Sequence, residues 1–425
     1  MEAKELRGLL PELRGFVKRF ADCFSDCRSR EHLPVYVQGQ VSDLDRKSVE
    51  PIALRSGLAP RTLQEFLSLL SWDHLRMRDR VQEIVAAEHQ GPNSVGLLDE
   101  TSFVKKGTKT PGVQRQWCGH LGKLENCAVT VHLGMAVGDF QCLLDGDLFL
   151  PESWDQDRER CRAAGIPDEV VYRPKWRIGL EQYDRAIANG LHFDWLTFDE
   201  GYGGKPEFLR ELSARKQRWM AEVPKNLCGW LTEPRVTTRP RRKGSRGRQA
   251  TTPRLVKGEA PARRLDVLLK RHPKLRDQPW TRYRLDDREQ GPSVWEAKHV
   301  WIILPNAQGL PGETRHLIVA RHVLTQGDVK YFLCDAPADT PTETLLWVAL
   351  TRHCVERCFQ DQKSELGLDH YEGRKYVGLL RHLYLTLVSY LFLMRAAKRR
   401  RGEKSGVDRA ANPPRHGPAN HRLVA

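Results

Sequence analysis

The sequence lacks the features that mark membrane, secreted or disulfide-stapled proteins. Its longest apolar stretch, 379–394, carries Arg381 and His382 and falls short of the ~20 residues that a membrane span needs. The N-terminus has no apolar signal-peptide core. None of the ten cysteines belongs to a Cys-x-x-Cys pair, which would be half of a common zinc site. We therefore expect a cytoplasmic chain that makes no membrane contact and whose thiols are reduced.

The positive charge of the chain is concentrated in two segments. The 425 residues carry a formal net charge of +15. Residues 235–264 carry eleven Lys or Arg and one Glu, and residues 395–425 carry nine Lys or Arg and two acids. Because these two segments together hold +17, the rest of the chain is near neutral at −2. Such localised charge favours a polyanionic partner, and nucleic acid is the first candidate.

Residues 1–90 are predicted to be helical, because apolar residues recur there at three- and four-residue spacing. Within them, Gly57 suits a left-handed helix end and Pro60 suits a first helical turn. This pattern fits a DNA-reading helix-turn-helix with Arg61 and Gln64 near the start of its second helix. An ordinary helical hairpin fits equally well, and the sequence alone leaves both open.

From about residue 94 the pattern changes to short apolar strands separated by helices. Strands are predicted at 95–98, 126–137, 195–198 and 217–223, and Asp145-Gly-Asp147 is interpreted as a hairpin turn. The order of these elements predicts a mixed sheet covered by helices. Further strands near 281–285, 294–304 and 316–323 suggest a β-rich insertion, and a long helix is expected over 342–366. We expect a basic, disordered tail after residue 396.

Two carboxylates stand in matched contexts, since Asp99 and Asp199 each follow a short apolar strand and precede a Glu. The carboxyl ends of such strands are where α/β sheets place ligands. A lone Asp at a strand end is usually a turn former or a helix cap. Because the same context occurs twice, a functional role for these two acids is about as well supported as a role in a turn or a helix cap.

A third acid lies on the expected helix 342–366. Arg352, Glu356 and Lys363 share one helical face because their separations are four and seven residues. A solvated face with an Arg352–Glu356 ion pair is the plain interpretation. The functional one is a metal-binding carboxylate between two cations that contact phosphate. Three acids suit two Mg²⁺ ions, which support phosphoryl transfer from hard oxygen ligands.

These residues carry a family resemblance. The segments Leu97-Leu-Asp99-Glu-Thr-Ser-Phe103, Thr197-Phe-Asp199-Glu-Gly-Tyr-Gly203 and Glu356-Arg-Cys-Phe-Gln-Asp-Gln-Lys363 resemble the DDE transposases of bacterial insertion sequences. The segment Gly112-Val-Gln-Arg-Gln-Trp-Cys-Gly119 is similar to the same branch, whose members are described as DDE-superfamily endonucleases. The resemblance covers about 90–395.

The resemblance implies an α/β fold with a ribonuclease-H-like mixed-sheet core, a β-rich insertion domain and a helical N-terminal domain. The implied division is 1–90 helical and DNA-binding, 91–225 first part of the core, 226–330 insertion with a basic loop, 331–396 last part of the core, and 397–425 basic disordered tail.

The resemblance also implies an activity, which is Mg²⁺-dependent cleavage at transposon ends followed by strand transfer by a 3′-hydroxyl, and it implies a site. Asp99, Asp199 and Glu356 would be catalytic ligands of two Mg²⁺ ions, with Mn²⁺ as a substitute. The family signature Tyr-x-x-Arg-x-x-x-Glu-x6-Lys is met by Arg352, Glu356 and Lys363, whereas Ala349 replaces the Tyr. The implied partners are the double-stranded DNA of transposon ends and target and a second copy of the chain, in a bacterial cytoplasm near the nucleoid.

Some assignments remain open at this stage. Glu365 is the alternative third acid, although it lies on another helical face and lacks the matching Arg. Further DNA-contacting cations are expected among Lys105, Lys106, Arg241, Arg242 and Lys243, each of which could instead lie on a solvated loop. The alternatives to a transposase are a ribonuclease-H-like endonuclease that only cuts and a catalytically inactive DNA-binding protein.

Overall fold

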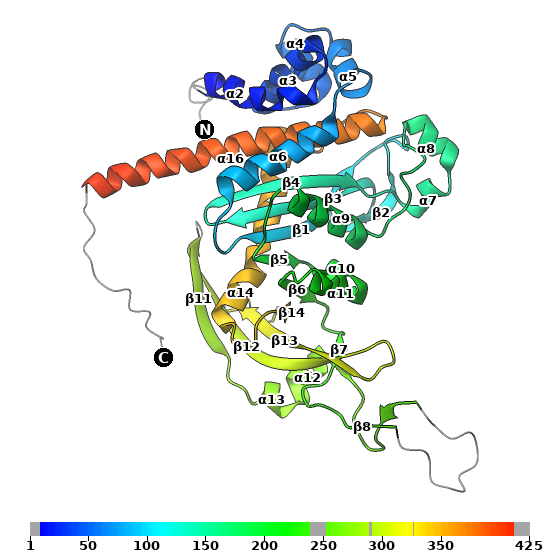
Figure 1. The fold of residues 1–425 in the computed structure, drawn as a ribbon, viewed down its shortest axis with the longest axis vertical. Helices are drawn as coiled ribbons and strands as arrows, with labels where there is room; N and C mark the ends of the chain where they lie inside the picture. Colours follow the sequence, from blue (N-terminus) through cyan, green and yellow to red (C-terminus); the bar gives the residue numbers. More distant parts are fainter. Residues whose placement is uncertain (1–8, 239–251, 289–290, 326, 412–425) are drawn as a thin grey trace.

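The computed structural model describes residues 9–238, 252–288, 291–325 and 327–411. Its described part is built on one mixed sheet of ten strands, which runs through most of the length of the molecule (Figure 1). A layer of N-terminal helices lies at one end, and the strands of the predicted insertion lie at the other. The mixed α/β class that the sequence predicts is confirmed.

The centre of the sheet comprises five strands in the order β4-β3-β1-β5-β6. They are β1 (Val95–Val104), β3 (Lys123–Val137), β4 (Phe140–Leu148), β5 (Trp195–Phe198) and β6 (Trp219–Val223). β1, β3 and β4 are antiparallel neighbours, whereas β5 and β6 run parallel to β1. Three antiparallel strands followed by two parallel ones form the sheet of a ribonuclease-H-like core, as predicted.

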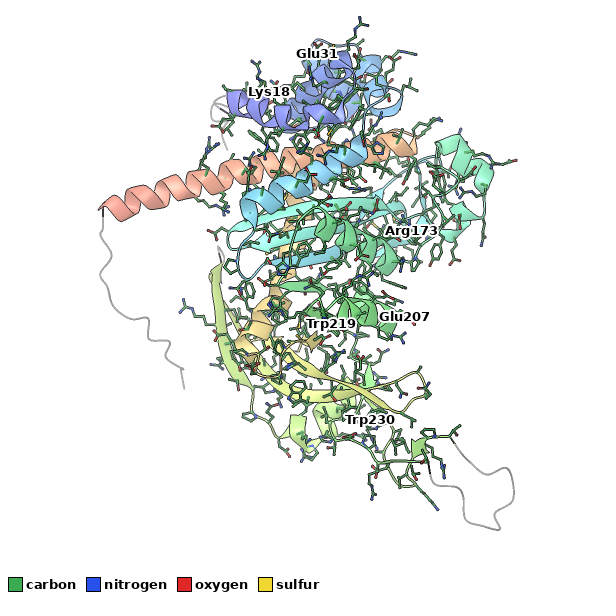
Figure 2. All side chains as sticks on the ribbon, in the orientation of Figure 1. Lys18, Glu31, Arg173, Glu207, Trp219 and Trp230 are labelled. Atoms are coloured by element: carbon green, nitrogen blue, oxygen red, sulfur yellow. The ribbon has the colours of Figure 1, made fainter. Side chains whose placement is uncertain are left out.

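The strands of the predicted insertion continue this same sheet. β14 (Val329–Asp335) pairs antiparallel with β6, and β13 (Pro311–His322), β12 (Gly291–Pro305) and β11 (Thr281–Arg288) follow outward. Trp230, labelled in Figure 2, directly follows β7 (Cys228–Gly229). It is joined to β12 by main-chain hydrogen bonds with Ile303. The insertion is β-rich, and its main strands hydrogen-bond into the catalytic sheet. The domain boundaries remain a prediction.

Shorter elements connect these strands. They are β2 (Gln114–Cys118), α7 (Glu152–Asp155), α8 (Arg158–Ala164), α9 (Lys175–Ala188), α10 (Glu200–Gly203), α11 (Pro206–Ala214), β7 (Cys228–Gly229), β8 (Val236–Thr237), β9 (Arg254–Leu255), β10 (Arg263–Arg264), α12 (Leu265–Arg271) and α13 (Pro273–Arg276).

The helix predicted over 342–366 is two helices, α14 (Thr342–Thr351) and α15 (His353–Leu366), which meet at Arg352. α14 lies against β5, β6 and β13, and α15 lies against β1 and β4. Because the two helices cover different strands, the break turns the chain at the level of β1. Arg352, at the junction of the two helices, therefore lies where the covered strands change from β5 and β6 to β1.

The N-terminal residues are helical as predicted. The elements are α2 (Leu10–Val17), the 3-10 helix η1 (Lys18–Cys23), α3 (Cys27–Gln40), α4 (Val49–Arg55), α5 (Pro60–Ser68) and α6 (His74–His89). Gly57, between α4 and α5, has φ +71°, a left-handed conformation that glycine adopts at little cost. Arg61 at the start of α5 is exposed and forms an ion pair with Glu65 at 2.7 Å.

The last helix, α16 (Tyr376–Ala411), crosses beneath the N-terminal helices and packs on β4 (Figure 1). Within the described chain it is long and apolar enough to cross a membrane, with mean hydropathy 1.5, but 83% of its apolar window is buried inside the protein. It is thus a core helix. It continues to Ala411, so residues 397–411 of the expected disordered tail are helical, because Lys, Arg and Ala favour helix there. Residues 412–425 lie outside the described part.

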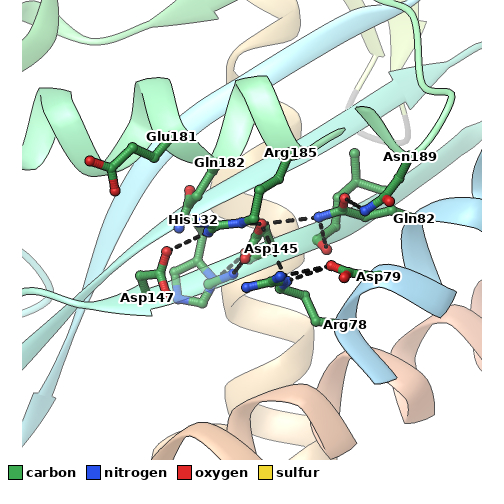
Figure 3. A network of polar contacts seen from close by, with 12 residues as sticks. Arg78, Asp79, Gln82, His132, Asp145, Asp147, Glu181, Gln182, Arg185 and Asn189 are labelled. Carbon is green, nitrogen blue, oxygen red and sulfur yellow. Dashed lines mark hydrogen bonds and ion pairs between the residues drawn. The ribbon is translucent and has the colours of Figure 1, made fainter. Parts of the chain in front are cut away.

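The prediction that Asp145 and Asp147 form a hairpin turn is wrong. Both lie inside β4, and Figure 3 shows them within a buried network of polar side chains. Asp145 is fully buried and accepts hydrogen bonds from Arg185 Nε and Gln82 Nε2, each at 3.0 Å. Asp147 accepts one from Arg185 Nη2 at 2.5 Å. The network ties β4 to α6 and α9, which sequence periodicity could not show.

Candidate active site

Asp99 and Asp199 are neighbours across two parallel strands. Leu98 of β1 is in register with Phe198 of β5, and each acid is the next residue. The sequence placed Asp99 at a strand end, but β1 continues to Val104 because its later residues pair with β3. Asp199 ends β5 and caps the short helix α10, accepting from the main-chain N of Gly201 at 3.0 Å. The register therefore brings the two carboxylates to one edge of the core.

Arg352 connects the predicted acids. Its Nη1 donates to Asp99 Oδ2 at 3.1 Å, and its Nη2 donates to Glu356 Oε1 at 2.9 Å. The guanidinium is only 15% exposed, whereas the Glu356 side chain is 49% exposed. The Arg352–Glu356 pair expected from the spacing is thus present. The same cation also holds Asp99, which lies far away in sequence.

The two aspartates share a strongly perturbed electrostatic environment. Burial raises the pKa of Asp99 to about 7, and the nearby Asp199 carboxylate adds to the rise while Arg352 opposes it. Burial also raises the pKa of Asp199, against the Arg352 cation and main-chain N–H groups. Each charged carboxylate therefore has too little compensating positive charge. Buried carboxylates that lack compensating positive charge favour the binding of a cation.

These side chains line a cavity of ≈ 840 Å³. Asp99 and Asp199 line it from the sheet, Arg352, Glu356 and Lys363 line it from the helices, and Glu365 is not among its lining residues. Lys363 is partly buried and donates from Nζ to Ser102 O at 3.1 Å. The structure gathers the three predicted acids around one cavity and leaves the alternative, Glu365, outside it.

Glu222 also belongs to this region, although the sequence analysis did not select it. It follows Ala221, which is in register with Phe198, so Asp99, Asp199 and Glu222 each come directly after an aligned residue on β1, β5 and β6. Glu222 Oε1 accepts from Lys330 Nζ at 2.9 Å, and its Oε2 lies 3.7 Å from Arg352 Nε. The signal available in the sequence was an acid inside an apolar strand.

The other predicted DNA-contacting cations have different surroundings. Lys105 Nζ donates to two main-chain oxygens, those of Asp369 at 3.0 Å and Tyr371 at 2.6 Å. Lys106 is exposed. Arg241, Arg242 and Lys243 lie outside the described residues. All five assignments remain predictions, and for Lys105 the contacts show a structural task.

The carboxylates fit a divalent cation, although the described residues do not contain a group of three Asp, Glu, His or Cys side chains that is already arranged around one point. Two buried aspartates with raised pKa values supply hard oxygen ligands next to an open cavity. Glu356 is the third acid on that cavity, and Arg352 holds it. Completing such a site requires Glu356 to exchange the guanidinium for the cation.

Comparison with known proteins identifies the family. The family model "DDE superfamily endonuclease" matches residues 19–292. The chain belongs to this family. DDE superfamily endonucleases generally use divalent metals, which agrees with the chemistry of the carboxylate pair.

Two individual proteins are also similar to this DDE superfamily endonuclease. The chain is 32% identical over 187 residues to the "Probable transposase for insertion sequence element IS701" of Microchaete diplosiphon, covering 43% of this chain and 46% of the relative. The match thus spans about half of that protein. The NurA nuclease from Sulfolobus solfataricus aligns over 69% of this chain and 92% of its own, at 11% identity and a TM-score of 0.24. The assignment of the core therefore rests on the strand order.

Proposed function

We propose that this DDE superfamily endonuclease is a DNA transposase. In this proposal it binds the ends of an insertion sequence, cleaves them and joins the freed 3′ ends to target DNA. The observation that carries the proposal is the meeting of Asp99, Asp199 and Glu356 on one cavity, with Arg352 and Lys363 beside them. The similarity to the IS701 protein, whose name describes a probable transposase, supports it.

In this proposal Asp99, Asp199 and Glu356 hold two Mg²⁺ ions, for which Mn²⁺ substitutes. When bound, such a pair of ions activates the attacking oxygen and stabilises the leaving oxygen of the phosphodiester. The chain itself fixes the geometry, because β1 and β5 set the spacing of the two aspartates. Lys363 places a cation at the same cavity, where it can contact a backbone phosphate.

Arg352 has a second task in the proposal. Without DNA it compensates the charge of Asp99 and Glu356. A bound DNA phosphate offers the same guanidinium a bidentate partner. The exchange would free both carboxylates, which would then be available to hold the metal ions. The partners are double-stranded DNA of transposon ends and target and a second copy of the chain, acting in the cytoplasm near the nucleoid.

The experiment compares the wild-type protein with Asp199→Asn on a plasmid that carries the gene with its native flanking DNA. We expect Asp199→Asn to bind the plasmid fragment normally and to lose cleavage with Mg²⁺ by at least about a thousandfold. Glu207→Gln, at an exposed position of α11, is the matched control and should cleave normally. Cleavage by the Asn variant would disprove the site.

The products also separate the alternative functions. Joined 3′ ends in a target plasmid identify a transposase. Cleavage by the wild type without joined products would identify an endonuclease that only cuts. Binding without cleavage by the wild type would identify an inactive DNA-binding protein.

A further inference from the structure

A patch of exposed apolar side chains lies on the hairpin that β2 and β3 form. Trp117 and Leu124 are each 57% exposed, and Leu121, in the connecting loop, is 43% exposed. Trp117 is in register with Leu124, so the two side chains lie on the same face of the hairpin. We call Trp117, Leu121 and Leu124 the hairpin patch. A cluster of exposed apolar side chains is typical of a surface that binds another molecule.

The hairpin patch adjoins the candidate active site. The loop between β2 and β3 supplies Gly119 and His120 to the cavity that Asp99 and Asp199 also line. Leu121 is the next residue of that loop, and Trp117 is two residues before Gly119. A ligand that fills the cavity and extends along this hairpin would therefore contact the hairpin patch.

The charges around the patch favour an anionic occupant. Arg115 is exposed and lies two residues before Trp117, so both side chains share a face of β2. Lys106 and Lys109 are exposed on the segment that follows β1, whereas Lys123 lies on the opposite face of the hairpin and is paired with Glu125 at 3.3 Å. Apolar and aromatic side chains between cations are typical of surfaces that bind nucleic acid.

The hairpin is also braced, so the patch is held in place. Cys118 and Cys127 are fully buried beneath it with Val129. Gln116 Nε2 donates to Cys127 O at 2.7 Å across the two strands. A rigid hairpin loses little conformational freedom when its tip contacts a partner.

We propose that the hairpin patch inserts into the DNA beside the reacting phosphate and stacks Trp117 on an unpaired base. The inference rests on the proposed function, since it takes DNA as the occupant of the cavity. Apolar side chains are known to wedge between base steps, and an aromatic ring stacks on a base of any sequence. Leu121 and Leu124 cover the flanking sugar and base edge, while Arg115, on the same face as Trp117, faces the backbone.

The test measures DNA binding in EDTA, so that it needs no chemistry. The probes are a 30-base-pair duplex and the same duplex with five unpaired nucleotides at one end, one of them 2-aminopurine. The wild-type protein should prefer the forked probe and quench its fluorescence. Trp117→Ala should weaken binding of the forked probe about tenfold, leave the paired probe within twofold, and abolish the quenching. Trp117→Phe should retain the preference.

Ile187→Ser is the matched control, because Ile187 is 39% exposed on α9, away from the cavity lining and outside the N-terminal helices. It should behave as wild type. The inference is overturned if the wild-type protein shows no preference for the forked probe, or if Trp117→Ala keeps it. It is also overturned if Trp117→Ala converts a dimer to a monomer in sedimentation, since the patch would then join two chains. Because binding is measured without metal, failure of Asp199→Asn to block cleavage would leave this result unaffected.

Discussion

Arg352 donates a hydrogen bond to Asp99 at 3.1 Å although 253 residues separate them in the sequence. The bond joins the junction of α14 and α15 to the centre of β1. It places a cation beside Asp99, a carboxylate that burial makes reluctant to ionise. Arg352 therefore links Asp99 to Glu356, and the following predictions test the parts of the site.

Asp99→Asn should stabilise the metal-free protein at neutral and alkaline pH. The folded-state pKa of Asp99 is about 7 against a usual value of 3.8, so the folded state retains a proton that the unfolded state releases. Stability from this group is fully present below about pH 4 and is lost as the pH rises through 7. Calorimetry should show a gain of about 4 kcal/mol for Asn at pH 8, which falls to about 1 kcal/mol at pH 4.5.

Divalent cations should reverse this order. Mg²⁺ binding only to the folded wild type raises its melting temperature by mass action. Asp99→Asn should show a smaller rise at the same Mg²⁺ concentration. An equal rise in both proteins would place the cation elsewhere.

Lys363→Ala should weaken DNA binding in a salt-dependent way. One lost phosphate contact lowers the slope of log K against log salt by about 1. Arg357→Ala is the control on the same helix, because Arg357 is paired with Asp361 at 3.1 Å and does not line the cavity. Equal slopes for Lys363→Ala and wild type, measured by fluorescence anisotropy, would remove Lys363 from the DNA interface.

The adjacent lysines 105 and 106 should differ in their effects. Lys105 serves two main-chain carbonyls, so Lys105→Met should lower the free energy of unfolding by about 2 kcal/mol. Lys106 is exposed, and Lys106→Met should leave stability unchanged. Urea denaturation of both variants checks the difference, and a stable Lys105→Met protein would contradict it.

Asp145→Ala should be strongly destabilising. It leaves Arg185 and Arg78 in a buried site with one carboxylate fewer, which costs about 3 kcal/mol. Asp139→Ala, in the exposed turn between β3 and β4, is the matched control. Denaturation curves that coincide for the two variants would show that the network in Figure 3 contributes little.

Removing 239–248 should flatten the salt dependence of DNA binding. This segment carries six Lys or Arg, each of which could neutralise one phosphate. We expect the slope of log K against log salt to fall by at least about 2. A Gly-Ser segment of equal length separates charge from length, and an unchanged slope with that segment would exclude these cations from binding.

The local part of the structure could be predicted from the sequence. The N-terminal helices, Gly57 and the strands before Asp99 and Asp199 follow from apolar periodicity and turn chemistry, which act over a few residues. The shared face of Arg352 and Glu356 follows from helical geometry. The proximity of Asp99 and Asp199 could be predicted only by assuming that their strands are parallel neighbours in the sheet.

The remaining features depend on contacts between distant segments. The extension of β1 past Asp99 needs pairing with β3, and the position of Glu222 needs β6 beside β5. Asp145 and Asp147 form a plausible turn sequence, but the cations that make their burial tolerable come from α6 and α9. The pairing of β14 with β6 also could not be predicted, because the residue pattern of one strand does not show which strand lies beside it.

The packing of α16 on β4 has a consequence for how the protein is made. β4 is synthesised well before α16, so the face of β4 that α16 covers stays open until that helix has been made. A chain truncated before residue 376 lacks this cover, and we expect its exposed apolar sheet to make it prone to aggregation and degradation.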